Sequence, residues 1–312
     1  MWSTLVGKEF VSRLQGRLTY VILTFLVALF TGLVLAAFWM VVINVPTIVP
    51  VIGSSVGSSS NITIQSLVAS NRGLFLFYAL TVCLLAAVFA VAPAVASSAL
   101  TSERENETFD LLLIGGLRAR SIVLGKLIAA VLFVLLLAST VLPGFAIAWM
   151  FGGVSARDVG LTLAVLLATL VFISAVGLLF SALARTSTIA ALYTYAFVYL
   201  LALGSLMAYL VGASTQNEAA VRPLLSLNPF VALITIPEFL AGALQQTLPF
   251  QYRAALDFTS HEWLGLSLRY PRWINTLAIY LLATIFLALV TGLAIDPCHR
   301  WRTRAEGRGG RD

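Results

Sequence analysis

The chain has 312 residues, of which 60% are hydrophobic and only 10% are charged. Soluble domains carry about 25% charged residues, so this composition excludes an ordinary soluble protein and indicates a protein that crosses a lipid bilayer several times. The formal net charge of +6 does not indicate nucleic-acid binding. Membrane proteins collect Lys and Arg in their cytoplasmic loops, and the sequence offers no basic soluble domain that could bind nucleic acid.

Residues 1–17 precede the first long apolar run and mix apolar with charged side chains. Trp2, Leu5, Val6, Phe10 and Leu14 recur at roughly helical spacing. This pattern predicts an amphipathic helix that lies in the membrane interface. A short solvated tail is the alternative interpretation.

Six apolar runs are long enough to cross the membrane, since a spanning helix needs about 20 residues. We expect the third run to be interrupted at Pro143-Gly144, and Phe151–Gly160 to form the turn that follows it. Arg185 to Ser187 would form a very short turn between the fourth and fifth spans. The predicted spans cover residues 18–43, 74–100, 121–150, 161–183, 189–211 and 274–295.

The segment between the last two spans, residues 212–273, contains apolar stretches at 227–230 and 234–244. They are too short to span, so we predict re-entrant or interfacial helices there. The sequence therefore predicts one all-α, polytopic membrane domain over residues 1–312. Its parts are an interfacial helix (1–17), a six-span bundle (18–296) and a basic cytoplasmic tail (297–312).

The distribution of basic residues predicts the orientation of the chain. If both termini are cytoplasmic, 13 of the 19 Lys and Arg residues fall in cytoplasmic segments. Cytoplasmic loops of membrane proteins carry an excess of Lys and Arg. We therefore expect both termini in the cytoplasm.

The spans offer little chemistry of their own. We count Lys126 with the charged segment before the third span, although that span is drawn from residue 121, and we expect no ionisable side chain at membrane depth. That argues against proton pumps and ion-coupled carriers, which need such groups there. His261-Glu262 begins a zinc motif, but Gly265 stands where its second His belongs, and Gly125-Lys126 lacks the rest of a P-loop. We expect no catalytic centre, metal site or cofactor in this chain, so any energy for transport would come from another protein.

The densest charge lies between the second and third predicted spans. Ser102 and Glu105 fit a capping box, and Phe109 begins an apolar face that Gly115-Gly116 would close. We predict a short cytoplasmic helix at about 101–114 that lies across the bundle axis and offers exposed Glu103 and Arg104 to a partner protein. An ordinary charged loop is the alternative.

The pattern Glu103-Arg104-Glu105-x-x-Thr108-x-x-Leu111-Leu112, followed by Gly125-Lys126, resembles the signature of ABC-2 type transporter permeases. Lys8-Glu9-Phe10 is similar to the N-terminal elbow helix of that family. Phe151-Gly152-Gly153 and Ser181-Ala182-Leu183 resemble the branch called multi-copper enzyme maturation permeases. Glu107 departs from the pattern, because family members often have Gly there.

The resemblance implies the membrane-spanning permease subunit of an ABC exporter in a prokaryotic plasma or inner membrane, without enzyme activity of its own. A separate soluble ABC ATPase would hold ATP and Mg²⁺, and a second permease copy or a paralogue would complete a dimer in the lipid bilayer. A non-transporting membrane scaffold or assembly factor, or an ion-coupled secondary carrier, would be the alternative. The implied ATPase-coupling residues are Glu103, Arg104, Glu105, Thr108, Phe109, Leu111, Leu112, Arg118 and Lys126.

Overall fold

A computed structural model describes most of the chain between residues 72 and 295. The described residues are 72–106, 119–152, 154–214, 224–234, 236 and 272–295, together with isolated positions between 24 and 39. Within these ranges the regular structure is entirely helical, and no residue of them forms a strand. An all-α fold is therefore confirmed for this part of the chain.

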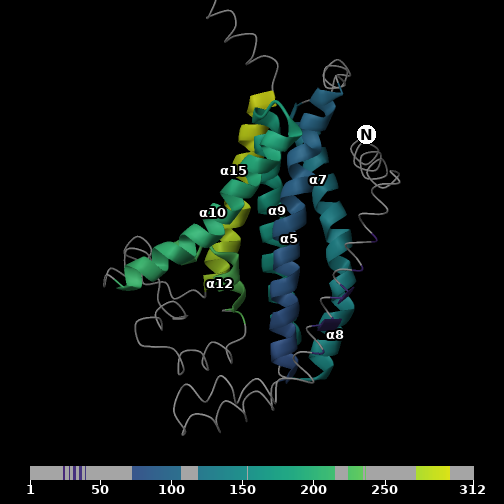
Figure 1. Cartoon of the computed structure of the whole chain (residues 1–312), viewed down its shortest axis with the longest axis vertical. Coiled ribbons are helices and arrows are strands. Elements are labelled where there is room, and N and C mark those ends of the chain that lie inside the picture. Colours follow the sequence, from purple (N-terminus) through teal and green to yellow (C-terminus); the bar gives the residue numbers. More distant parts are fainter. Residues whose placement is uncertain are drawn as a thin grey trace, which may run out of the picture.

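The helices run up and down between two ends of one bundle (Figure 1). We call the end that holds Glu105, Ala119, Leu183 and Ile295 the charged end, and the end that holds Arg72 and Met150 the opposite end. The elements in chain order are α5 (Arg72–Glu105), α7 (Ala119–Ala138), η2 (Ser139–Val141), α8 (Leu142–Met150), α9 (Ala156–Leu183), α10 (Ser187–Ser214), α12 (Pro229–Ile234) and α15 (Arg272–Ile295).

Five helical stretches within the described residues are long and apolar enough to cross a membrane. They match the second to sixth predicted spans, so the chain is a multi-pass membrane protein. The first predicted span, the interfacial helix 1–17 and the tail 297–312 lie outside the described residues, apart from the isolated positions between 24 and 39. The stretches are Leu76–Glu105, Ser121–Met150, Ala156–Leu183, Ser187–Val211 and Trp273–Ile295.

The third predicted span is interrupted, as its sequence predicts. The short 3₁₀ segment η2 separates α7 from α8, and Pro143 stands in the first turn of α8. A proline lacks the N–H that would bond the carbonyl four residues earlier, and its ring crowds that carbonyl. The carbonyl in question belongs to Ser139, which instead accepts a bond from the backbone N–H of Leu142. The irregularity therefore lies one turn before the proline.

The turn between α8 and α9 is shorter than the sequence predicted. Helix α9 begins at Ala156, so the prediction that the turn extends to Gly160 is wrong. The reason is a capping box: the Ser155 hydroxyl accepts from the Asp158 backbone N–H, and the Asp158 carboxylate accepts from the Ser155 backbone N–H. These two bonds satisfy N–H groups that the first turn of a helix leaves unpaired.

Helices α5 and α9 form the tightly packed centre of the bundle. Small residues allow this approach: a Cβ added to Gly177 of α9 would lie 2.7 Å from the Ala96 Cβ of α5. Small residues bring membrane helices into close backbone contact, where van der Waals packing replaces the hydrophobic effect. Nearby, Ser181 of α9 accepts hydrogen bonds from the backbone N–H groups of Leu100 (2.9 Å) and Thr101 (3.0 Å).

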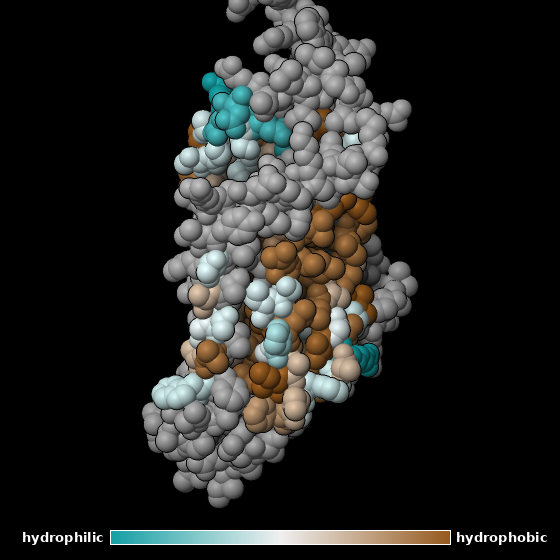
Figure 2. Space-filling view, turned by 90° about the vertical axis from the view of Figure 1, so that its right-hand side faces the viewer, coloured by the Kyte–Doolittle hydropathy of each residue, from teal (hydrophilic) through white to brown (hydrophobic). Residues whose placement is uncertain are grey.

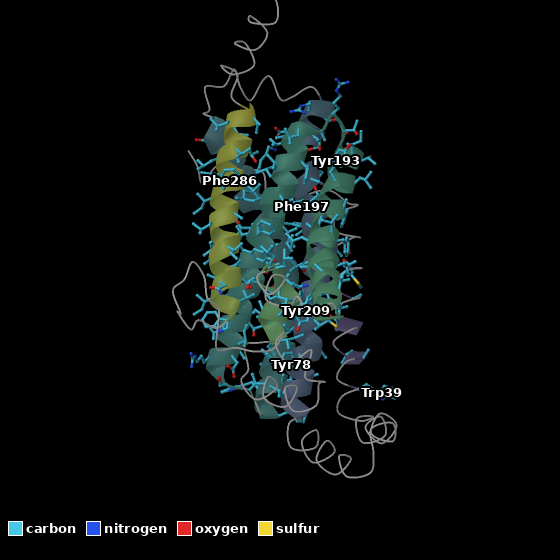
Figure 3. The ribbon with its side chains drawn as sticks, turned by 90° about the vertical axis from the view of Figure 1, so that its left-hand side faces the viewer. Trp39, Tyr78, Tyr193, Phe197, Tyr209 and Phe286 are labelled. Atoms are coloured by element: carbon cyan, nitrogen blue, oxygen red, sulfur yellow. The ribbon has the colours of Figure 1, made fainter. Side chains whose placement is uncertain are left out.

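The periphery is less enclosed than this centre. About two thirds of the α9 span is buried (67%), against 28% for α10 and for α15. Helix α10 leans away from the bundle toward the opposite end (Figure 1). Figure 3 shows Tyr193 and Phe197 near the charged end of α10, and Figure 2 shows an apolar band on the face that carries α7 and α8.

Candidate functional site

Glu103, Arg104 and Glu105 form the last turn of α5. The prediction that a separate helix starts near residue 101 is therefore wrong. Ser102 lies inside α5, where its carbonyl accepts from the backbone N–H of Asn106, so Ser102 does not cap a new helix. Residues 107–118 lie outside the described residues. The charged turn consequently points along the bundle axis and reaches the ends of three neighbouring helices.

Glu103 binds α7 through Lys126. The Lys126 Nζ lies 2.6 Å from the Glu103 Oε1 and also donates to the Ala99 carbonyl at 2.7 Å. The Lys126 side chain is 3% exposed and the Glu103 side chain is 19% exposed. Lys126 thus lies inside the span Ser121–Met150, and the expectation of charge-free spans is wrong at this position. A buried lysine requires an anion and further acceptors, and α5 supplies both.

Arg104 binds the end of α9. Its guanidinium donates to the Ala184 carbonyl at 2.7 Å and to the Ala182 carbonyl at 3.2 Å. The last carbonyls of a helix have no intrahelical partner, and the C-terminal end of the helix dipole attracts a cation. The planar guanidinium therefore both satisfies these carbonyls and matches their partial charge.

Glu105 binds the beginning of α10. Its carboxylate accepts from the backbone N–H of Ser187 and from the Ser187 hydroxyl, both at 2.8 Å. The first N–H groups of a helix are unpaired, and the helix dipole favours an anion there. Two consecutive residues of α5 thus bind the two sides of the 184–186 turn. The cation Arg104 binds the end of α9, and the anion Glu105 binds the start of α10.

We call Glu103, Arg104, Glu105, Lys126 and Ser187 the helix-end clamp. The clamp ties the charged end of α5 to α7, α9 and α10 through charge-assisted hydrogen bonds, which are shorter and stronger than neutral ones. The prediction that Glu103 and Arg104 are exposed is wrong: both are half-buried. Glu103 pairs with the Lys126 side chain of α7 and Arg104 with the end of α9, which sequence spacing alone does not reveal.

The clamp brings together only some of the predicted coupling residues. Glu103, Arg104, Glu105 and Lys126 belong to it, whereas Thr108, Phe109, Leu111, Leu112 and Arg118 lie outside the described residues. Sequence reasoning missed Ser187. Its position directly after the 184–186 turn and before an apolar run is typical of a helix start, but its partner on α5 is 82 residues away.

A second polar cluster lies toward the opposite end. Asn228 donates to the Ala202 carbonyl (2.8 Å) and to the Ser205 hydroxyl (3.0 Å) of α10, and its side-chain oxygen accepts from the Phe230 N–H at the start of α12. From α15, Tyr280 donates to the Leu227 carbonyl at 2.7 Å. These contacts hold the segment 224–234 between α10 and α15.

This segment falls where the sequence predicted re-entrant or interfacial helices. Helix α12 covers Pro229–Ile234, so a short helix is present near the first of these predicted positions. Residues 237–244 lie outside the described residues. In the described ranges no group of three or more His, Cys, Asp or Glu residues could hold a metal ion.

A family model described as "ABC-2 family transporter protein" matches residues 53–294, which is most of the chain and includes every helix from α5 to α12. No curated protein matches the chain significantly.

Proposed function

Because this chain belongs to the ABC-2 family of transporter proteins, we propose that it is the permease subunit of an ATP-driven exporter. A separate soluble ATPase binds ATP and Mg²⁺ and supplies the energy. The helix-end clamp supports this proposal most directly, because it offers one mechanical connection from a single cytoplasmic segment to four helices.

The clamp and the adjoining segment have different tasks in this mechanism. Residues 107–118 contact the ATPase, with Phe109, Leu111 and Leu112 filling an apolar notch while Thr108 and Arg118 make polar contacts. Glu103, Arg104, Glu105 and Lys126 do not dock the partner. They pass its displacement to the ends of α7, α9 and α10. Charge-assisted bonds suit this task because their partners resist separation.

The rest of the assembly follows from the same resemblance. Two permease copies, or this chain and a paralogue, pair in a prokaryotic plasma membrane, with the charged end in the cytoplasm. The 224–234 segment, bound to α10 through Asn228, then lies toward the outside. Membership of the multi-copper enzyme maturation branch stays a prediction.

The proposal is tested on the permease co-expressed with a candidate soluble ABC ATPase from the same source and purified in nanodiscs. We expect the two proteins to co-elute and to hydrolyse ATP, and we expect Phe109→Asp to abolish co-elution. Arg104→Gln and the milder Ser187→Ala should keep co-elution but lose the ATP-dependent change in hydrogen exchange of α10. Arg185→Gln is the matched control, since Arg185 is exposed beside the same turn.

Two outcomes would overturn the proposal. If no P-loop protein co-purifies with the permease, no ATPase is present to supply the energy for transport. An unchanged ATP response of α10 in both clamp variants would show that the clamp does not transmit movement.

A further inference from the structure

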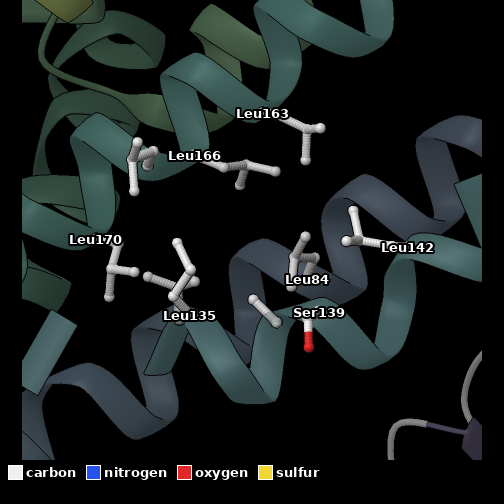
Figure 4. Close-up of a pocket in the computed structure, with 10 residues that line it drawn as sticks. Leu84, Leu135, Ser139, Leu142, Leu163, Leu166 and Leu170 are labelled. Carbon is white, nitrogen blue, oxygen red and sulfur yellow. The ribbon is translucent and has the colours of Figure 1, made fainter. Parts of the chain in front are cut away.

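An apolar groove of about 250 Å³ lies between α5, the α7–η2–α8 helix and α9 (Figure 4). Its lining consists of aliphatic side chains and Ser139. The Ser139 hydroxyl already donates to the Leu136 carbonyl at 2.6 Å. The groove therefore offers an occupant hydrocarbon contact and almost no polar contact.

The groove is closed at its floor and open at its mouth. On the floor, Leu84 and Leu166 are 3% and 4% exposed. At the mouth, Leu135, Leu142 and Leu167 are 42%, 44% and 44% exposed. An occupant can therefore enter sideways, from the surface of the bundle, without any helix moving.

The break in the third span explains why this space exists. Ala138 ends α7 and Ser139 begins η2, and both line the groove. Their side chains are small, and the 3₁₀ segment changes the spacing of side chains before Pro143 redirects the chain into α8. The same proline that interrupts the span thus leaves a gap between it and α9.

The depth of the groove places it among lipid tails. Leu84 lies eight residues after Leu76, where the α5 span starts, and Leu166 lies ten residues after Ala156, where α9 starts. A helix rises ~1.5 Å per residue, so both lie about 12–15 Å from the starts of their spans. Since the hydrocarbon core is about 30 Å thick, the groove lies near the middle of the core, away from headgroups.

The size and chemistry of the groove select its occupant. Water needs two to four polar partners to remain in a cavity, and the lining does not supply them. An α-helix is ~10 Å across, far wider than a hydrocarbon chain, and the bilayer supplies hydrocarbon chains at this depth. A segment of one such chain therefore suits the groove better than a helix does. We propose that this groove binds one acyl chain of a membrane phospholipid and keeps it longer than the surrounding lipids.

The test uses the full-length chain in phosphatidylcholine nanodiscs that contain a phospholipid with a diazirine in the middle of one acyl chain. After illumination, mass spectrometry maps the labelled residues. Leu282 and Phe286 of α15 are 68% and 66% exposed, more than the leucines at the mouth. Casual contact with lipid would therefore label α15 more strongly, whereas a retained chain labels Leu135, Leu142 and Leu167 more strongly.

A variant that fills the groove provides the second part of the test. Ala138→Phe should reduce labelling of the groove to the level of α15, and Leu163→Phe on the facing wall serves if Ala138→Phe does not fold. Leu282→Phe, on the exposed face of α15, is the control and should leave groove labelling unchanged. Stronger labelling of α15 than of the groove in the original protein would overturn the proposal. So would groove labelling that persists in the filled variants, or a cross-link between the groove and residues 18–43.

Discussion

At the scale of single residues, the clamp depends on one buried ammonium group. Lys126 is 3% exposed, and it contacts both the Glu103 carboxylate and the Ala99 carbonyl. Removing one partner of a buried pair leaves an uncompensated charge, whereas replacing both partners costs much less. Lys126 therefore depends on its partners, unlike the loop lysine that the sequence suggested.

We predict that Glu103→Gln and Lys126→Met each lower the free energy of unfolding by about 3 kcal/mol. The double variant should lose clearly less than the sum of the two, because neither charge then remains buried alone. Unfolding in mixed micelles with increasing SDS measures the three values. Arg185→Met, at an exposed position of the same end, should change the value little. Additive effects of the two substitutions would contradict the assigned ion pair.

At the scale of elements, α5 and α9 form the fixed pair around which the other helices pack. Their contact at Gly177 leaves no space for a side chain, because an added Cβ would also lie 3.2 Å from the backbone nitrogen of Ser97. Gly204 of α10 is different: its nearest neighbour, the Leu200 Cγ, is 4.0 Å away. The two glycines therefore separate the effect of packing from the effect of helix propensity.

We predict that Gly177→Ala destabilises the protein by about 1–3 kcal/mol, the usual cost of overpacking. Gly204→Ala should be neutral or stabilising by up to about 1 kcal/mol, because alanine favours the helix. Adding Ala96→Gly to Gly177→Ala should restore part of the loss, since it removes the atom 2.7 Å away. Thermal unfolding in one detergent compares the four proteins. Equal losses for the two glycine substitutions would contradict the close contact.

At the scale of the whole molecule, the helices alternate in direction, so the connections before and after α9 lie at opposite ends of the bundle. Exposed Thr186 follows α9 at the charged end, and exposed Arg157 lies in its first turn at the opposite end. The excess of Lys and Arg in the segments at the charged end predicts that this end lies in the cytoplasm.

We predict that a membrane-impermeant maleimide labels Arg157→Cys in intact cells and labels Thr186→Cys only after the membrane is permeabilised. Both variants are made after Cys83 and Cys298 have been replaced by Ser, so the new thiol is the only target. The unlabelled Cys-free protein is the control. Labelling of Thr186→Cys from outside would reverse the orientation and remove the clamp from the reach of a cytoplasmic ATPase.

The sequence by itself determined the five described spans, the break before Pro143 and the family. Length and apolarity decide a span because the bilayer demands about 20 apolar residues, and a proline acts on its own helix. These are local properties. The family also follows from a local pattern, Glu103-Arg104-Glu105 with its neighbours.

Only the tertiary structure decided what those charged residues do. Arg104 reaches carbonyls 78 and 80 residues away, and Glu105 reaches Ser187 across 82 residues. Their partners are mostly backbone groups at helix ends, which every helix has and no side-chain pattern marks. The sequence therefore located the charges correctly but assigned them to a docking surface, whereas helix packing pairs Glu103 with Lys126, Arg104 with the end of α9 and the still exposed Glu105 with the start of α10.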